Sequence, residues 1–316
     1  SLASGERKAV LLGNAAAQHP QATTLLALAN WIGAQTGASV GYLTESANTV
    51  GAQLVGALPR NGGLDAGRML GGTALKACLL LDVDPALDAA DANAATAALR
   101  AAEMVVVMSP FKTAAHDVAD VLLPISPFTE TSGTFVNAEG RVQSFHGVVK
   151  PRADTRPAWK VLRVLGNMMA LQGFDFETSE EVRAEALGDL STLAARLDNT
   201  VSSELPTPAV AARDPEGCER IADVPIYAGD SLVRRAAALQ MTTDARPPVA
   251  HLPEGLWTRL ELAPGAKVRV AQGGADAVLP AVLDLTLAAN TVRVPAGHPD
   301  TSALGAMFGV LTVEKA

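Results

Sequence analysis

Cysteine and histidine side chains are the commonest ligands of catalytic and redox metals, and this chain of 316 residues has few of them. Its two cysteines, Cys78 and Cys218, are far apart, and neither belongs to a C-x-x-C pair. An iron–sulfur cluster normally needs four ligands, mostly cysteine thiolates. The histidines also lack the spacing of a zinc site; they are His19, His116, His146, His251 and His298. We therefore expect no metal site within this chain.

Nucleotide-binding and nucleophile motifs are incomplete as well. A dinucleotide fold needs G-x-G-x-x-G after its first strand, so that the backbone can approach the pyrophosphate. Here that position reads Gly13-Asn14-Ala15-Ala16-Ala17, which has one glycine of the three. The sequence also contains no G-x-S-x-G elbow. We assign no catalytic residue from the sequence.

One segment, residues 127–143, combines many small polar side chains with two glycines, Gly133 and Gly140. Glycine lets the backbone approach a neighbouring group closely. The segment could line a cofactor pocket, or it could be a self-hydrogen-bonded hairpin that closes a sheet. Composition favours the hairpin, and the pocket remains the alternative.

The elements that would position these residues alternate along the first half of the chain. Apolar runs predict strands, and 3.6-residue periodicity predicts helices. We expect strands at 8–12, 39–43, 76–83, 104–108 and 121–125, and helices at 21–36, 48–58 and 91–102. Such alternation predicts a doubly wound α/β domain with a mostly parallel sheet covered on both faces. The continuous apolar runs at 79–81 and 105–107 fit strands buried on both sides.

The second half of the chain has a different pattern of apolar and polar residues. Residues 158–169 predict a helix with one apolar stripe, residues 178–198 are helical, and a proline-rich linker follows at 202–216. From about Thr242 the pattern is all β, with strands expected at 257–262, 267–271, 277–287 and 291–294. We predict two domains: a doubly wound α/β domain over residues 1–240 and a small β-barrel over residues 241–316.

Composition excludes some classes of partner. The net charge is −8 and the sequence has no run of Lys and Arg, so the electrostatic attraction that drives nucleic-acid binding is missing. No apolar stretch approaches the roughly 20 residues of a spanning helix, so we expect no direct membrane insertion. The start, Ser1-Leu2-Ala3-Ser4, lacks an initiator Met and a signal-peptide core. We expect a processed chain or, by preference, a piece of a longer one.

Two regions resemble the molybdopterin oxidoreductase superfamily. The first is residues 120–143, in which Asp120-Val121-Leu122-Leu123-Pro124 leads into Glu130-Thr131-Ser132-Gly133-Thr134-Phe135-Val136-Asn137 and Glu139-Gly140-Arg141-Val142-Gln143. In that superfamily the segment belongs to the doubly wound domain that helps hold the pterin cofactor. The second region, from about Trp257 to Gly305, looks like the superfamily's C-terminal β-barrel.

Further segments resemble one branch, the large iron–sulfur subunit (G subunit) of bacterial NADH:quinone oxidoreductase, complex I of the respiratory chain. They are residues 47–52, 144–151, 155–163 and 225–240. The resemblance implies a structural and assembly module of the electron-transfer arm, with the iron–sulfur clusters in an N-terminal part that precedes this sequence. The implied partners are the other peripheral-arm subunits, on the cytoplasmic, peripheral side of the inner membrane.

That branch is taken to have kept the fold and lost molybdenum and pterin. We therefore expect no cofactor in this chain, and Gly133, Thr134, Asn137 and Arg141 are candidates only for a vestigial pterin pocket. The alternative is the cofactor-holding part of a molybdopterin-dependent oxidoreductase such as a formate dehydrogenase. A third hypothesis is the central domain of a thiamine-diphosphate enzyme, but the Gly-Asp-Gly signature of that class is missing.

Overall fold

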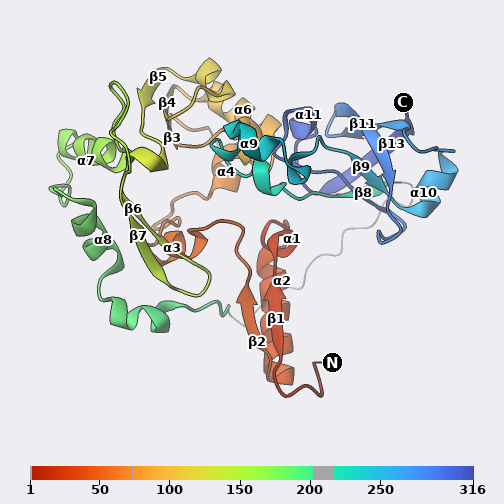
Figure 1. Ribbon diagram of the computed structural model, residues 1–316, viewed down its shortest axis with the longest axis horizontal. Helices are drawn as coiled ribbons and strands as arrows, with labels where there is room; N and C mark the ends of the chain where they lie inside the picture. Colours follow the sequence, from red (N-terminus) through yellow and green to blue (C-terminus); the bar gives the residue numbers. More distant parts are fainter. Residues whose placement is uncertain (1, 73, 202–216) are drawn as a thin grey trace. The chain divides into compact units, whose positions relative to one another are not determined.

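The structure is a computed structural model and describes residues 2–72, 74–201 and 217–316. The chain divides into two compact units, each built from two separate stretches of sequence. Unit 1 comprises Ser1–Gly63 and Ile125–Val210, and unit 2 comprises Leu64–Pro124 and Ala211–Ala316. Figure 1 colours the chain along its sequence and labels the elements of both units. The predicted linker at 202–216 lies outside the described residues.

Unit 1 begins with a strand–helix–strand motif. Strands β1 (Ala9–Leu12) and β2 (Ser39–Tyr42) pair in parallel, and helix α2 (Ala22–Thr36) connects them and packs on both, after the short helix α1 (Asn14–Ala17). Gly37 ends α2 in the left-handed conformation, at φ 72°, which glycine adopts without steric cost. A Cβ at Gly33 would lie 2.8 Å from the Val40 side chain, so the helix approaches the sheet closely.

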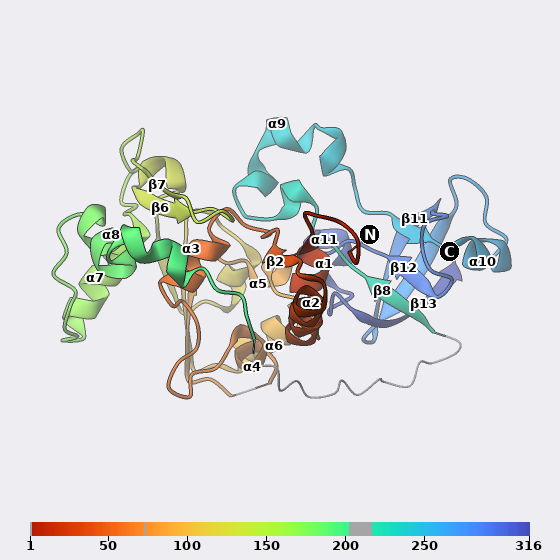
Figure 2. The same cartoon turned by 90° about the horizontal axis from the view of Figure 1, so that it is seen from below.

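The rest of unit 1 is a hairpin surrounded by helices. Strands β6 (Gly133–Val136) and β7 (Val142–Phe145) are antiparallel. Both views place α3 (Thr49–Leu54), α7 (Ala158–Met168) and α8 (Ser179–Leu187) around this hairpin (Figures 1 and 2). The core of this region consists of Val136, Leu187 and Leu193, with Val50, Leu54 and Val142 packed against them. Leu193 comes from the 3-10 helix η3 (Leu190–Arg196).

Unit 2 contains a three-stranded parallel sheet in the order β3-β4-β5, formed by Ala77–Leu81, Met104–Ser109 and Val121–Pro124. Helix α6 (Ala92–Ala101) connects the first two strands, and the 3-10 helix η1 (Ala114–Val118) precedes the third. They cover one face of the sheet, where Leu99 and Ala115 pack against Val105 and Val107. The remaining short helices near this sheet are α4 (Ala66–Leu70) and α5 (Pro85–Asp88).

The opposite face of this sheet differs from the prediction. Residues 79–81 are not buried on both sides, because Leu79 is 46% exposed and Leu81 is 40% exposed. Met104, on the neighbouring strand, is also exposed. An apolar run reports the preference of its side chains for burial, but neighbouring segments decide whether both faces are covered. The two parallel sheets are also separate among the described residues, with β1 and β2 in one and β3, β4 and β5 in the other.

The C-terminal part of unit 2 is a closed six-stranded barrel in the order β10-β11-β9-β12-β8-β13. Its strands are β8 (Cys218–Ile221), β9 (Ala250–Leu252), β10 (Lys267–Gln272), β11 (Ala275–Leu283), β12 (Thr291–Arg293) and β13 (Gly309–Lys315). The predicted small barrel is thus present. Strand β8 comes from before residue 241, and the division of the chain at residue 240 stays a prediction.

The strand expected at 257–262 is wrong. Residues Glu254–Arg259 form helix α10 after Pro253, and Leu256 is buried in the barrel core. Leu256 and Leu260 are four residues apart, so both reach the same side of a helix, where Trp257 also contacts the core. This helical spacing outweighs the short alternation that suggested a strand.

Short helical segments complete the described chain: η2 (Phe128–Glu130), η4 (Ile226–Ala228), η5 (Val233–Arg235), α9 (Ala237–Gln240), η6 (Thr243–Ala245) and α11 (Pro299–Ser302). Across residues 2–72, 74–201 and 217–316, no helix has both the length and the apolar character needed to cross a membrane.

Candidate functional site

The polar segment singled out in the sequence forms the β6–β7 hairpin of unit 1, as its composition predicts. The Asn137 side chain closes the turn: its Oδ1 accepts hydrogen bonds from the backbone N–H groups of Glu139, at 3.1 Å, and Arg141, at 2.9 Å. Gly140 occupies the turn with φ 80°, a conformation that favours glycine. Asn137 and the Arg141 backbone therefore fix the hairpin.

Gly133 and Thr134 lie at the other end of the hairpin. A Cβ at Gly133 would lie 2.7 Å from the Phe145 ring, so the close packing of these two residues requires glycine. The hydroxyls of Thr134 and Ser144 are hydrogen-bonded across the strands at 3.0 Å. Phe135 and Phe145 pack with their ring centroids 5.1 Å apart. Gly133 and Thr134 thus occupy a closely packed strand end, separated from Asn137 and Arg141 by the length of the hairpin.

Gly133 and Thr134 line a cavity of unit 1 with a volume of about 370 Å³, which we call the smaller cavity. The walls come from α3, β6, the start of α7 and α8, and they are mainly apolar, with Ala52, Val55, Val182, Ala186 and Leu187. Asn48 and Arg183 add polar groups. Asn48 Oδ1 accepts a hydrogen bond from the Val136 N–H at 2.9 Å, and Arg183 Nη1 donates to Ser144 Oγ at 2.8 Å. Asn137 and Arg141 line neither this cavity nor a larger one in the same unit.

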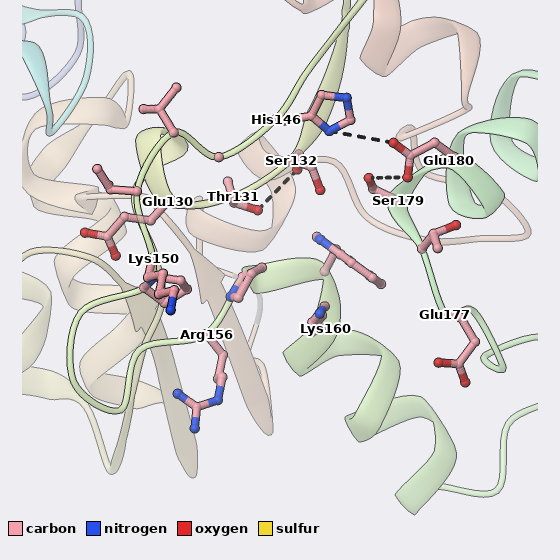
Figure 3. A pocket seen from close by; sticks show the side chains of 17 residues that line it. Glu130, Thr131, Ser132, His146, Lys150, Arg156, Lys160, Glu177, Ser179 and Glu180 are labelled. Atoms are coloured by element: carbon pink, nitrogen blue, oxygen red, sulfur yellow. Dashed lines mark hydrogen bonds and ion pairs between the residues drawn. The ribbon is translucent and has the colours of Figure 1, made fainter.

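The larger cavity, of about 810 Å³, has a charged lining (Figure 3). Three basic residues, Lys150, Arg156 and Lys160, come from the loop before α7 and its first turn. Figure 3 shows Glu177, Ser179 and Glu180 on the opposite side, near the start of α8. Glu130 also lines the cavity and lies beside Lys150, so the side that carries the basic residues holds one carboxylate as well.

Two acidic residues of the larger cavity, Glu130 and Glu180, have partners within the chain. Glu130 Oε2 accepts a hydrogen bond from the Arg152 N–H at 3.0 Å. Glu180 lies 3.8 Å from His146 Nδ1 and accepts from the Ser179 hydroxyl at 3.1 Å. Hydrogen bonds from its own backbone N–H and from Ser179 lower the pKa of the Glu180 carboxyl, so this residue is ionised at neutral pH.

Trp159 lines both cavities, at the start of α7. Its indole Nε1 is buried and has no hydrogen-bond partner among the described residues. A buried donor without an acceptor is costly and calls for an explanation. Sequence reasoning missed Trp159 and the basic residues of the larger cavity. One signal was available: residues 148–163 carry five basic residues and one acidic residue in an acidic chain.

Metal-ligating residues do not converge in the part of the chain that the structure describes: it has no group of three or more His, Cys, Asp or Glu that could hold a metal ion. Cys78 is half-buried and Cys218 is buried, and both are free thiols. Burial raises the pKa of each thiol. A protonated thiol is a poor nucleophile, so neither cysteine is suited to nucleophilic chemistry.

Comparison of the sequence with known proteins identifies a matching family and several relatives. Residues 2–168 match the family model described as molybdopterin oxidoreductase, which is more than half of the chain. A Staphylococcus aureus (strain MRSA252) protein named "Putative formate dehydrogenase SAR2393" is 33% identical over 93 residues, which are 29% of this chain and 9% of that protein. A protein of the same description from strain USA300 is 37% identical over 84 residues, 27% of this chain and 8% of that protein.

Among solved structures, acetylene hydratase from Pelobacter acetylenicus aligns with a TM-score of 0.56 and 18% sequence identity. The alignment covers 76% of this chain and 44% of the acetylene hydratase chain. At this identity the likeness concerns the fold alone. The mixed α/β structure with parallel sheets and a closed barrel agrees with it. The chain thus spans less than half of the solved structure and less than a tenth of each named relative.

Proposed function

The chain belongs to the molybdopterin oxidoreductase family, and we propose that it is the cofactor-holding part of a molybdopterin-dependent oxidoreductase of the formate dehydrogenase kind. One finding favours this proposal over the complex I assignment, and a second agrees with it. The curated relatives named above are described as formate dehydrogenases. The family match also runs through residue 168, so it includes the hairpin and the start of α7 that border both cavities. We further expect the two parallel sheets to belong to one doubly wound layout.

The observation that carries the proposal is the unpaired indole N–H of Trp159 at a mainly apolar cavity. A pterin is a flat heteroaromatic ring with nitrogen and oxygen acceptors on its edge. Ligand pockets typically combine apolar walls with a few placed polar groups, and the smaller cavity has this character. The residues present therefore fit a pterin ring.

In this assignment, Gly133 and Thr134 would form the strand edge beside the ring, and Trp159 would donate a hydrogen bond to it. Asn137 and Arg141 would act only by fixing the turn of the hairpin. The apolar side chains of α3 and α8 would exclude water from the site. When bound, the cofactor would supply the redox chemistry.

The proposal is tested on the full-length protein purified from its host. We expect about one molybdenum per chain by elemental analysis and a fluorescent pterin after oxidation. Trp159→Phe keeps the ring and removes the N–H, so it should lower the pterin content. Trp31→Phe is the matched control, because Trp31 is exposed on α2 and lines neither cavity. A wild-type protein with neither molybdenum nor pterin would refute the proposal.

The second candidate is the one suggested by the complex I resemblance, a structural module that contacts other peripheral-arm subunits at the cytoplasmic side of the inner membrane. One observation favours it: α7 and the turn after it expose Val164, Met168, Met169 and Leu171. Exposed apolar patches of this kind mark protein contacts. Co-purification of peripheral-arm subunits with full-length protein that lacks molybdenum and pterin would favour this candidate.

A further inference from the structure

We propose that two copies of the chain associate through helix α7 of unit 1, with the two helices packed antiparallel about a two-fold axis. The surface involved is the exposed apolar patch of α7 and the turn after it, formed by Val164, Met168, Met169 and Leu171. We call it the α7 patch. The proposal does not rest on the proposed function, because the patch lines neither cavity. It assigns to a second copy the surface that the complex I candidate assigns to other subunits.

The first observation is the exposure of the α7 patch. Met168 is 80% exposed and Met169 is 63% exposed, and Val164 lies one helical turn before Met168 on the same face. Both views show α7 at the edge of unit 1, beside α8 (Figures 1 and 2). Exposed apolar side chains that gather in one place mark a contact surface, because covering them removes apolar area from water. Methionine also adapts readily to the shape of a partner.

The second observation is the distribution of charge around the α7 patch. Residues 148–163 contain five basic residues and one acidic residue, whereas residues 164–181 contain four acidic residues and no basic residue. The acidic segment returns along the helix, because Phe174 packs against Gly166. Asp175, the neighbour of Phe174, thus lies beside the second half of α7. The surface therefore carries positive charge at the start of the helix and negative charge beside its second half.

The third observation is that two charges of this surface are not paired within one copy. Lys160 and Asp175 are both exposed, and neither has an ion-pair partner within 4.0 Å among the described residues. Lys160 Nζ lies 5.3 Å from the centroid of the Trp159 ring, and this cation–π contact keeps the ammonium group at the start of α7. Each charge is thus available to a partner molecule.

A second copy supplies the complement of this surface. A two-fold axis places the same surface of each copy against the other, so every contact occurs twice. When the two α7 helices run antiparallel, Val164 faces Met168 of the partner subunit, and Lys160 faces Asp175 of the partner subunit. The arrangement also brings Lys160 near the carbonyl end of the partner helix, where the helix dipole favours positive charge. Apolar contact and charge attraction then act together.

Other occupants match only one part of the surface. An anionic membrane or an acidic protein would be attracted by residues 148–163 and repelled by the carboxylates of residues 164–181. A parallel arrangement of two α7 helices would place like charges side by side, which weakens binding. In the antiparallel pair, both signs of charge face the opposite sign.

The test measures association of the full-length protein by sedimentation equilibrium. We expect a reversible dimer with a Kd on the order of 10 μM, because a contact centred on one helix is at the small end of specific interfaces. Met168→Glu should weaken association by about tenfold or more, since it places a charge in the apolar centre of the contact. Met241→Glu is the matched control, because Met241 is exposed and lies in unit 2, outside the patch. This control should associate as the wild type does.

Two charge reversals test the antiparallel arrangement. Lys160→Glu and Asp175→Lys should each weaken self-association by about threefold or more, because like charges then meet at two symmetric contacts. An equimolar mixture of the two variants should recover association, since each variant carries the charge that the other lacks. Both positions are exposed, so the variants should fold normally, which circular dichroism checks.

A wild-type protein that stays monomeric would overturn the proposal. So would equal association of Met168→Glu and Met241→Glu, or a mixture of the two charge variants that associates no better than either variant alone. Recruitment of the monomeric protein to phosphatidylserine vesicles, or binding of another subunit that Met168→Glu abolishes, would assign the α7 patch to a different occupant and overturn the proposal as well.

Discussion

Gly166 lies inside α7, where alanine would ordinarily be the better helix former by about 1 kcal/mol. The structure gives a reason for glycine at this position. Gly166 is buried, and a Cβ there would lie 2.3 Å from the Phe174 ring. Gly255 in α10 offers the opposite case, because nothing lies within 4 Å of its added Cβ. An alanine at Gly255 therefore tests helix propensity alone, whereas an alanine at Gly166 also tests the packing against Phe174.

We expect Gly166→Ala to destabilise the chain by about 1–3 kcal/mol, because Phe174 must move out of its packed position. Gly255→Ala should instead stabilise it by about 0.5–1 kcal/mol, since alanine lowers the conformational entropy of the unfolded chain. Urea unfolding of both variants at neutral pH measures the difference. If Gly166→Ala were as stable as Gly255→Ala, Phe174 would not pack closely against Gly166, and the explanation for glycine at this position would be refuted.

A second residue-scale prediction concerns Asp84, which is only 5% exposed. Burial raises the pKa of its carboxyl, and the nearby Asp88 carboxylate raises it further. The hydrogen bond from the Ala86 N–H and the charges of Arg234 and Arg235 lower the pKa in part. The folded state therefore binds this proton more tightly than the unfolded state does. Protonated Asp84 stabilises folding at low pH, and this contribution is lost as the pH rises through the raised pKa.

We expect Asp84→Asn to be at least as stable as the wild type at pH 7, by on the order of 1 kcal/mol, because asparagine carries no buried charge. Its Oδ1 can still accept from the Ala86 N–H, as Asp84 Oδ1 does at 3.3 Å. The difference should shrink as the pH falls toward 4 and the wild-type carboxyl becomes protonated. Urea unfolding of both proteins between pH 4 and 7 measures it, and a difference independent of pH would contradict the mechanism.

At the scale of elements, α7 has the apolar stripe that its sequence predicts, but the C-terminal half of that stripe is exposed. Leu165 is 37% exposed, Met168 and Met169 are exposed, and Ala158, Val161 and Leu162 are half-buried. Inward packing of the whole stripe would make Leu165→Asp collapse the domain. The structure predicts a milder effect, because the carboxylate can reach water.

We expect Leu165→Asp to cost about 1 kcal/mol or less, and Leu187→Asp to cost about 3 kcal/mol or more. Leu187 is the matched control: it lies on α8 in the same unit and is 4% exposed, within the core formed with Val136 and Leu193. Thermal melting of the two variants compares them directly. An equal loss of stability in both would show that the α7 stripe packs inward.

Local pattern alone was sufficient to predict many elements. The strands β1 to β5 and the helices α2 and α6 lie where apolar runs and 3.6-residue periodicity predict them. In these elements the pattern of apolar side chains within the segment itself is enough to indicate a strand or a helix. Strands β8, β9 and β13 escaped prediction. Strands β8 and β9 have only four and three residues, and all three strands pair with partners distant in sequence, such as Leu311 of β13 opposite Cys218 of β8. Whether a sheet face is covered also depends on segments distant in sequence, which explains why burial of residues 79–81 on both sides was predicted wrongly.

The candidate site shows the same limit. The hairpin at 133–145 followed from its composition, and the two cavities did not. Their walls combine segments from residues 48 to 187, and only tertiary packing brings these together. The unpaired state of the Trp159 N–H is likewise a property of its surroundings. The sequence shows which side chains are present, but only the folded structure shows which of them lie next to one another.

At the scale of the whole molecule, the barrel of unit 2 depends on a strand that is distant from the others in sequence. Strand β8 pairs in parallel with β12 and antiparallel with β13. It also carries Arg220, which is fully buried and donates hydrogen bonds to the carbonyls of Val294, Pro295 and Ala306 and to Gln272 Oε1, at 3.0–3.3 Å. Burial lowers the pKa of Arg220 to about 10, so it remains charged at neutral pH.

The barrel should therefore fold as the fragment 217–316, which contains all six strands and the buried core from Cys218 to Leu311. The fragment 241–316 lacks β8 and Arg220. Its strands β12 and β13 would present unpaired backbone groups, and the acceptors of Arg220 would lose their donor, at about 1–3 kcal/mol for each buried group left without a partner. We expect cooperative thermal unfolding of 217–316 and a broad, low-temperature or absent transition for 241–316.

The variant Arg220→Met in fragment 217–316 separates the two causes. It keeps β8 and its strand pairing, and it removes only the guanidinium and its hydrogen bonds. Its melting temperature should lie below that of the intact fragment and above that of 241–316, because pairing of β8 and satisfaction of the buried acceptors both contribute. Equal stability of 217–316 and 241–316 would show that the barrel closes without β8. A variant as stable as the parent would assign the whole effect to strand pairing and none to Arg220.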